Sequence, residues 1–99
     1  NADAIGVFDA TDNTFALVNI AAQINTERKF LGGAVAPNGK IVFAPYNADA
    51  IGVFDATDNT FALVNIAAQI NTKEKFGGAA VAPNGKIVFT PLNADAIGV

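Results

Sequence analysis

The sequence contains no cysteine, histidine, methionine or tryptophan. Disulfides, thiol nucleophiles, imidazole general bases and ordinary zinc sites all depend on cysteine or histidine, so none of these is expected. Any catalysis would have to rest on carboxylates and lysines. The absence of methionine also leads us to expect an excised or engineered segment.

Charge is scarce as well. Only 15% of the 99 residues are charged, against about 25% in an average protein, and 52% are hydrophobic. The six lysines and arginines are scattered through a chain of net charge −3, whereas nucleic-acid binding needs a clustered basic patch. We therefore expect a folded chain with much apolar surface to bury and no nucleic-acid partner.

Long hydrophobic runs are missing too. No stretch approaches the roughly 18 to 20 apolar residues of a membrane-spanning helix, and the first residues lack the basic start and apolar core of a secretory signal. We expect no membrane partner, and the composition leaves the cellular compartment open.

What the sequence does have is a repeat of 46 residues. Residues 1–46 and 47–92 are two copies, and residues 93–99 begin a third copy that is identical to residues 1–7. The copies differ at six positions: Glu27/Lys73, Arg28/Glu74, Leu31/Gly77, Gly33/Ala79, Ala44/Thr90 and Tyr46/Leu92. Repeats of this length are typical of solenoids, propellers and other arrays, whose units bury their faces against their neighbours. Such near-identity indicates recent duplication or deliberate design.

Each period contains four predicted strands, at residues 33–36, 41–44, 50–54 and 60–66. The first two flank Pro37-Asn38-Gly39-Lys40, and the Asn-Gly pair predicts a type I′ hairpin turn. Residues 55–59 form a polar turn before the fourth strand. Helical periodicity is not sustained in residues 21–30, which we expect to be an exposed loop with room for one helical turn.

The predicted strands are apolar on both faces. In residues 15–18, for example, Phe15 and Leu17 alternate with Ala16 and Val18. A sheet with two apolar faces needs cover on both sides, and the blades of a β-propeller give each other that cover. The sequence therefore predicts an all-β protein, a β-propeller with two four-stranded blades per chain.

Residues 36–60 carry a resemblance to a known family. They contain a Pro-Asn-Gly-Lys turn, a strand, an Asn-containing turn, a strand with valine, and a turn rich in Asp, Thr and Asn. This segment resembles the YVTN-type β-propeller repeat, whose Tyr-Val-Thr-Asn stretch corresponds to Phe-Ala-Pro-Tyr at residues 43–46. The near-identical periods are also similar to those of symmetric designed propellers. The resemblance implies the propeller fold, and no functional residue is carried over from it.

Two blades cannot close a ring, because propellers have about four to eight, and an isolated pair would expose broad apolar faces. We therefore expect the chain to associate with itself, as a homotrimer with six blades or a homotetramer with eight. Because residues 1–7 and 93–99 are identical, both ends compete for one position in the closing blade. We expect residues 78–92 of one chain to pair with residues 4–20 of the next. The residues expected at this interface are Ala4, Ile5, Val7, Phe8, Phe15, Leu17, Val18, Ile87, Val88, Phe89, Ile97 and Val99.

Three other interpretations compete with a purely structural role. A binding module would hold a ligand or cation in the central channel or on a loop face. Asp9, Asp12 and Asn13 offer oxygen atoms suited to calcium, although side chains at this spacing more often cap tight turns. An enzyme is disfavoured, because the repeat gives every aspartate a near-equivalent neighbourhood and acid–base pairs need different ones. We expect no cofactor and no catalytic residue.

Two smaller features bear on assembly. The charges of Glu27 and Arg28 are reversed in Lys73 and Glu74, which either sets the pairing between chains or is ordinary surface variation. The paired glycines at positions 32, 33, 77 and 78 are expected where neighbouring blades converge, because small residues let backbones approach.

Overall fold

The computed structural model describes residues 3–99. It confirms the all-β prediction, with eight strands and, within this range, no helix. The strands are β1 (Ala4–Asp9), β2 (Thr14–Asn19), β3 (Phe30–Val35), β4 (Ile41–Pro45), β5 (Ala50–Asp55), β6 (Thr60–Asn65), β7 (Phe76–Val81) and β8 (Ile87–Pro91). No helix long and apolar enough to cross a membrane occurs in the described part of the chain. The first two residues of the N-terminal copy, 1–7, lie outside the described residues.

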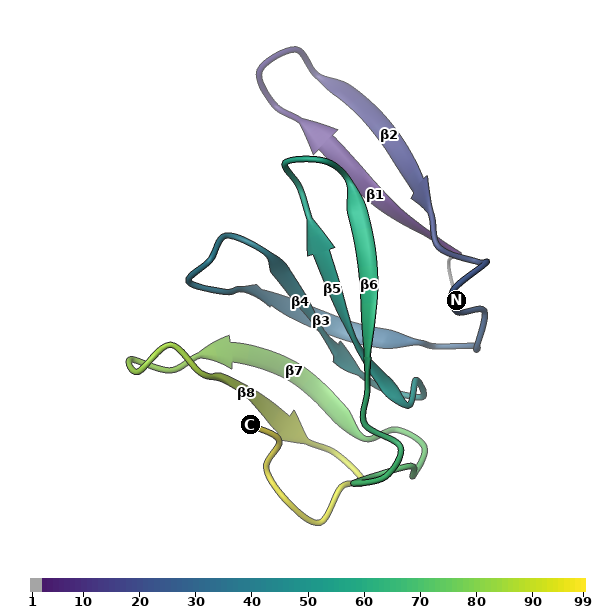
Figure 1. The fold of residues 1–99 in the computed structure, drawn as a ribbon, viewed down its shortest axis with the longest axis vertical. Helices are drawn as coiled ribbons and strands as arrows, with labels where there is room; N and C mark the ends of the chain where they lie inside the picture. The colour runs from purple at the N-terminus through teal and green to yellow at the C-terminus, as the bar shows by residue number, and fades with distance from the viewer. Residues whose placement is uncertain (1–2) are drawn as a thin grey trace.

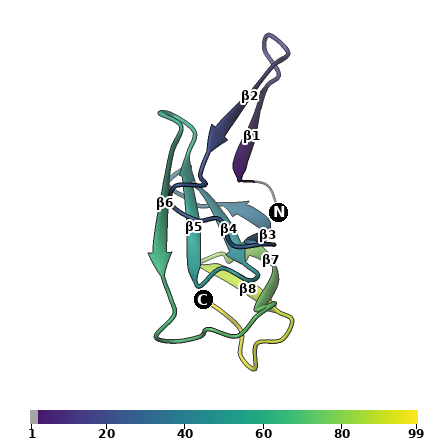
Figure 2. The same ribbon diagram turned by 90° about the vertical axis from the view of Figure 1, so that its right-hand side faces the viewer.

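The strands form three antiparallel sheets. A central sheet has the order β3-β4-β5-β6, and two hairpins, β1-β2 and β7-β8, stand on either side of it along the longest axis (Figure 1). The β1-β2 hairpin projects at one end of the molecule (Figure 2). Each 46-residue period of the sequence therefore supplies hairpins to two different sheets.

The strand register repeats with the sequence. The central sheet pairs Ala50 with Asn65 and Asp55 with Thr60, and the same ladder recurs 46 residues earlier between β1 and β2. The hairpins β3-β4 and β7-β8 also share their pairing, each with an irregularity near its first residues. Identical or closely similar local sequences thus give hairpins of the same kind, whether or not a further strand lies beside them.

The turn between β3 and β4 corrects the type I′ prediction. Gly39 has a φ of 85° and donates its N–H to the oxygen of Ala36, but Asn38 does not have a positive φ. The hydrogen bond from Gly39 to Ala36 makes Pro37 and Asn38 the central residues of the turn, and proline, whose φ is fixed near −65°, cannot supply the positive φ that a type I′ turn needs at both central positions. The chain instead makes a type I turn followed by a left-handed glycine, the usual three-residue hairpin.

The connection before β3 is only partly the exposed loop that the sequence predicts. It begins with a single helical turn, in which the N–H groups of Gln23 and Ile24 are donated to the oxygen of Ile20. Near its end, the side chain of Lys29 is only 4% exposed. The charge of Lys29 is accepted inside the molecule because a carboxylate meets it there, as described below for the equivalent Lys75.

The apolar core lies between the sheets and is divided into two clusters. The first is centred on Ile20, Phe54 and Phe61 and joins β1-β2 to the central sheet. The second is centred on Ala44, Phe76 and Phe89 and joins the central sheet to β7-β8. Each sheet therefore buries apolar side chains against the next, which is where a sheet that is apolar on both faces must place them.

The backbones of two neighbouring sheets approach each other at Gly32 and Gly78. Strands β3 and β7 are in contact, and a Cβ added to Gly32 would lie 3.5 Å from the Cα of Gly78. Gly32 also has a φ of 75°, which disfavours other residues. The prediction that these glycines allow the backbones of successive units to approach is confirmed at this pair.

Candidate assembly interface

The two copies of one hairpin sequence differ greatly in exposure. Phe8 of β1 is 60% exposed, whereas Phe54, its equivalent in β5, is 3% exposed. Phe15 of β2 is 65% exposed, and its equivalent Phe61 in β6 is 9% exposed. Because the two hairpins share sequence and register, the difference comes from their neighbours. β5-β6 is joined to β3-β4, whereas within residues 3–99 no equivalent pair of strands lies beside β1-β2.

The structure divides the residues expected at the interface into three groups. Phe8, Phe15, Leu17, Ile97 and Val99 are exposed. Others already pack inside the chain: Ile5, Val7 and Val18 against the first core cluster, Ile87 against the second, and Phe89 within the second. Ala4 and Val88 are half-buried.

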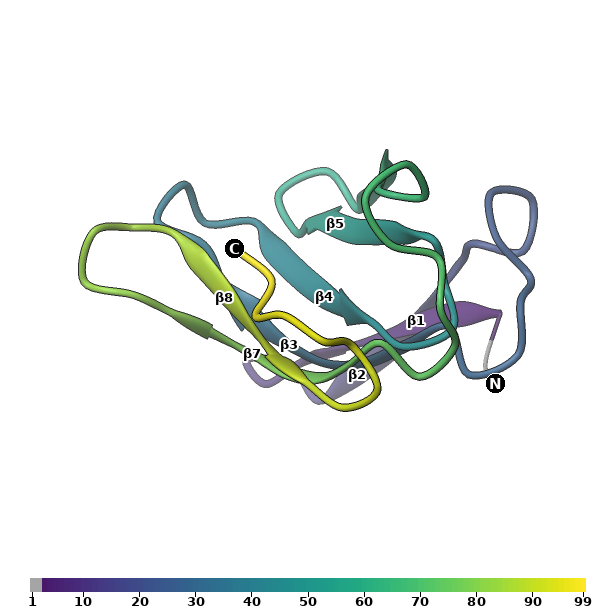
Figure 3. The same cartoon turned by 90° about the horizontal axis from the view of Figure 1, so that it is seen from below.

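The opposite end of the molecule presents the open edge of β8. In the central sheet, the equivalent strand β4 pairs with β5 through Ile41 with Phe54, Val42 with Val53 and Phe43 with Gly52. Beside β8 there is no such strand, and the edge carries one isolated bridge, between Phe89 and Gly98 (Figure 3). At one end, the hairpin β1-β2 therefore lacks a strand pair like the one that β3-β4 provides for β5-β6. At the other end, β7-β8 lacks a hairpin like the one that β5-β6 provides for β3-β4.

An open pocket of about 380 Å³ lies beside β1. Residues of β1 and of the central sheet form most of its walls. The pocket therefore lies on the side of the first core cluster where β1-β2 lacks a strand pair equivalent to β3-β4. At the second core cluster the corresponding place is filled by Ala44 of β4, which is fully buried with Phe76 and Phe89. The pocket is lined by Ala4, Ile5, Gly6, Ile20, Lys29, Phe30, Gly32, Phe43 and Phe61.

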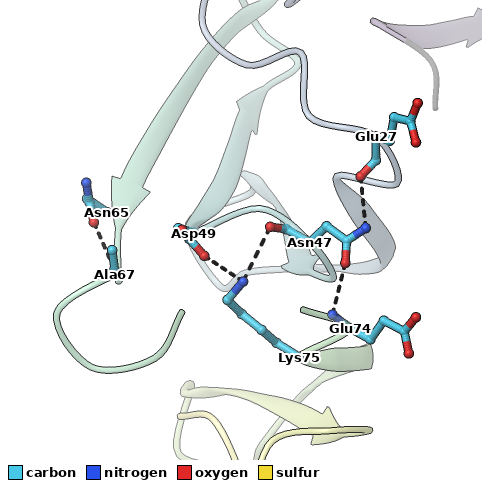
Figure 4. Close-up of polar contacts among 7 residues, drawn as sticks. All are labelled: Glu27, Asn47, Asp49, Asn65, Ala67, Glu74 and Lys75. Atoms are coloured by element: carbon cyan, nitrogen blue, oxygen red, sulfur yellow. Dashed lines mark hydrogen bonds and ion pairs between the residues drawn. The ribbon is translucent and has the colours of Figure 1, made fainter. Parts of the chain in front are cut away.

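Two buried lysines tie each sheet to the one before it. Lys75 precedes β7, and its Nζ lies 2.7 Å from Oδ1 of Asp49 and 3.4 Å from the oxygen of Asn47 (Figure 4). Lys29 precedes β3 in the same way and pairs with Asp3 at 2.6 Å. Asp3 and Asp49 are half exposed and serve as the partners of these ammonium groups.

Asn47 reinforces the same junction. Its Nδ2 donates to the oxygen of Glu27 at 3.1 Å, and its Oδ1 accepts the N–H of Glu74 at 2.9 Å (Figure 4). One amide side chain therefore links the loop before β3 to the loop before β7. Like the two lysine pairs, the side chain of Asn47 therefore connects one sheet to the next.

These polar links were missed by reasoning from the sequence. A signal was present, since the repeat changes the two positions before each lysine, Glu27/Lys73 and Arg28/Glu74, but keeps Lys29 and Lys75. The changed positions have a backbone role. Arg28 and Glu74 have φ values of 50° and 54°, and their carbonyl oxygens accept the N–H groups of Asn47 and Asn93. The proposed effect of their charges on pairing between chains stays a prediction.

The aspartates considered as calcium ligands cap their own turns. Oδ1 of Asp9 accepts hydrogen bonds from the N–H and Oγ1 of Thr11, and Asp12 does the same with Thr14. Asn13 adopts a left-handed φ of 59° in the same turn. The hydroxyl hydrogen bond, followed by the backbone one, lowers the pKa of both carboxyls. The turn interpretation is confirmed, and residues 3–99 contain no group of three His, Cys, Asp or Glu residues placed to hold a metal ion.

Comparison with known proteins adds no relative. No protein-family model matches the chain, and neither a curated protein nor a solved structure matches it.

Proposed function

We propose that the 99-residue chain is a structural protein without catalytic activity, whose copies join head to tail into a closed β-propeller. In this assembly β7-β8 of one chain and β1-β2 of the next form one four-stranded blade. Three chains give six blades and four chains give eight. The observation that carries the proposal is the contrast in exposure between Phe8 and Phe15 on one hairpin and Phe54 and Phe61 on its identical copy.

The central sheet supplies the template for the mixed blade. Its register, transferred by 46 residues, places Ile87 of one chain opposite Phe8 of the next and Phe89 opposite Gly6. Every backbone group on the open edge of β8 would then find a partner, as the edges of β4 and β5 do. The two ends of the molecule are therefore complementary in strand order as well as in sequence.

The pocket beside β1 fits the same arrangement. Ala44 packs on Phe76 and Phe89 in the second core cluster. By the repeat, Thr90 of a second copy would occupy the pocket and pack on Phe30 and Phe43. A second copy thus fills the one side of the first cluster that the chain itself leaves open.

The apolar burial favours association. Burying an exposed phenylalanine contributes about 1.5 to 3 kcal/mol, so Phe8 and Phe15 together offer about 3 to 6 kcal/mol per junction. Closing a ring requires only one kind of interface, because every junction between neighbouring chains is the same. A closed ring also pairs the β8 edge of every chain, whereas an open row of copies would leave one β8 edge unpaired at its end.

The test is the mass of the assembled protein in solution, measured by native mass spectrometry and light scattering over a range of dilutions. We expect three or four chains per particle with little dependence on concentration. A folded monomer that persists at high concentration would overturn the proposal.

A matched pair of variants separates assembly from folding. Phe8→Glu places a charge on the exposed hairpin and should give a folded monomer. Phe54→Glu places the same charge at the equivalent buried position and should unfold the chain. If Phe8→Glu leaves the oligomer intact, the hairpin β1-β2 is not at the interface.

A further inference from the structure

We propose that the C-terminal segment, residues 93–99, is a plug that occupies the edge of β8 in the free chain and is displaced by β1 of a second copy during assembly. The proposal rests on the proposed function, since it describes how the same edge changes occupants. In this proposal the C-terminal segment slows association of the chains, and it is not part of the completed four-stranded blade.

The segment is bound to β8 in the way that β5 is bound to β4. The N–H of Phe89 is donated to the oxygen of Gly98 at 2.8 Å, and the N–H of Gly98 to the oxygen of Phe89 at 3.3 Å. This pair is the equivalent of Phe43 and Gly52 in the central sheet. The segment therefore lies beside β8 in the same register in which β5 lies beside β4.

Side-chain packing and the preceding turn repeat as well. The ring of Phe76 lies over Gly98 as that of Phe30 lies over Gly52, so close that a Cβ at either glycine would meet the ring at about 3 Å. Upstream, the N–H groups of Asn93 and Ala94 are donated to the oxygens of Glu74 and Lys75. The segment is thus anchored at its start and seated under an aromatic ring near its end.

The plug is nevertheless a weak substitute for the strand that it imitates. β5 makes three registered pairs with β4, whereas the segment makes one bridge with β8. Ile97 and Val99 are 64% and 75% exposed. Strand β1 of a second copy would bring β2 with it and bury Phe8 and Phe15, which the segment does not provide.

The two occupants exclude each other. An antiparallel edge accepts one strand, and residues 1–7 and 93–99 have the same sequence, so both require the same pairs with β8. A second copy cannot seat Gly6 under Phe76 while Gly98 lies there. Assembly must therefore release the segment, and holding the segment in place must prevent assembly.

A disulfide lock tests this exclusion in a chain that has no cysteine of its own. In the double variant Val88→Cys and Val99→Cys, extending the register of the Phe89–Gly98 bridge by one residue would place the new cysteines opposite each other, as Val42 lies opposite Val53 in the central sheet. We expect the oxidised variant to be a monomer and the reduced variant to form the same oligomer as the unmodified chain. Because the reduced form is its own control, a folding defect is detected directly.

A second pair of variants reports the displaced state. Val88→Cys with Val7→Cys should give disulfides between chains on oxidation of the assembled protein, since the transferred register places these residues opposite each other. Val88→Cys with Ile5→Cys, two residues out of register, should give at least tenfold fewer. Deleting residues 93–99 should leave the oligomer intact and speed its formation.

The outcomes separate this proposal from the proposed function. If the oxidised lock assembles as readily as the reduced form, the segment is no plug, and self-assembly still stands. If the deletion abolishes assembly, the C-terminal segment itself belongs to the closing blade, and the proposal is overturned. If neither the unmodified chain nor the deletion variant assembles, the proposed function fails and the plug fails with it.

Discussion

Lys75 joins two sheets through its ammonium group, whose nitrogen lies 2.7 Å from a carboxylate oxygen of Asp49. Lys75 directly precedes β7, and Asp49 directly precedes β5. The lysine is completely buried, whereas half of the aspartate surface remains exposed. The two partners therefore depend on the contact to different degrees. Loss of the lysine leaves an aspartate that water can solvate, and loss of the aspartate leaves a buried charge.

This asymmetry predicts unequal effects of two substitutions. Asp49→Ala should lower the free energy of unfolding by about 1 to 3 kcal/mol, because a buried charged donor loses its main acceptor. Lys75→Met keeps the volume and should cost less than about 1 kcal/mol. Urea unfolding at one fixed chain concentration measures both. Equal losses, or a larger loss for Lys75→Met, would contradict the role assigned to the pair.

The turn at Gly39 gives a second prediction. Its φ is 85° and a Cβ there would meet no atom within 4 Å, so any penalty is one of backbone conformation rather than of space. Gly39→Val should cost about 1 to 2 kcal/mol, and more if β3 and β4 lose their register. Gly39→Asn, the matched control, should cost clearly less because asparagine tolerates this region. Thermal unfolding distinguishes the two, and identical midpoints would argue against the backbone explanation.

The turn aspartates predict a dependence of stability on pH. Hydrogen bonds from Thr11, Thr14 and Thr57 lower the pKa of Asp9, Asp12 and Asp55 in the folded chain. Their contribution to stability is therefore complete above the ordinary aspartate pKa of about 3.9 and is lost as the pH falls through the lower pKa of the folded state.

The measurement is a series of unfolding curves between about pH 6 and pH 2, together with titration of the aspartate carboxyls by NMR. Thr11→Ala should raise the pKa of Asp9 toward its ordinary value and reduce the loss of stability at low pH. Because Asp12 keeps Thr14, its pKa serves as the internal control. An unchanged pKa of Asp9 in this variant would show that the hydroxyl does not set it.

The change from Ala44 to Thr90 between the copies gives a prediction about assembly. Ala44 is fully buried, and Thr90 would be buried in the same way by a second copy. A buried hydroxyl without a partner costs free energy, so Thr90→Ala should stabilise the oligomer without changing the free chain. The reverse change, Ala44→Thr, should destabilise the chain itself by about 1 to 3 kcal/mol. Dissociation by dilution and urea unfolding measure the two effects separately.

The local sequence predicts most of the strands. Residues 50–54 and 60–66 were expected as strands, and the structure has β5 at Ala50–Asp55 and β6 at Thr60–Asn65. Alternating apolar residues and turn signals specify these elements because they act over a few neighbours. At Gly39 the Asn-Gly pattern predicts the wrong turn type, because it takes no account of the fixed φ of Pro37.

The links between sheets could not be predicted in the same way. Lys29 meets Asp3 across 26 positions and Lys75 meets Asp49 across the same separation, so neither pair leaves a local pattern. Only the three-dimensional arrangement shows that residues 21–30, expected to be exposed, end in a buried charge. The composition of the central sheet, by contrast, follows from the repeat, because the sheet joins the second half of one period to the first half of the next.

The contact of Gly32 with Gly78 has a consequence for the size of the ring. A head-to-tail interface closes only when the rotation from one unit to the next divides a full circle, so stoichiometry is a matter of angle rather than of affinity. Strands β3 and β7 are in contact, and a Cβ on Gly32 would lie 3.5 Å from the Cα of Gly78, so the packing of this pair is one of the contacts that fix that rotation. A methyl group at position 32 would make only an ordinary van der Waals contact with Gly78, so a change of this angle needs a larger side chain there. In the proposed ring, the number of chains would then depend on a position that also lines the pocket facing the next copy.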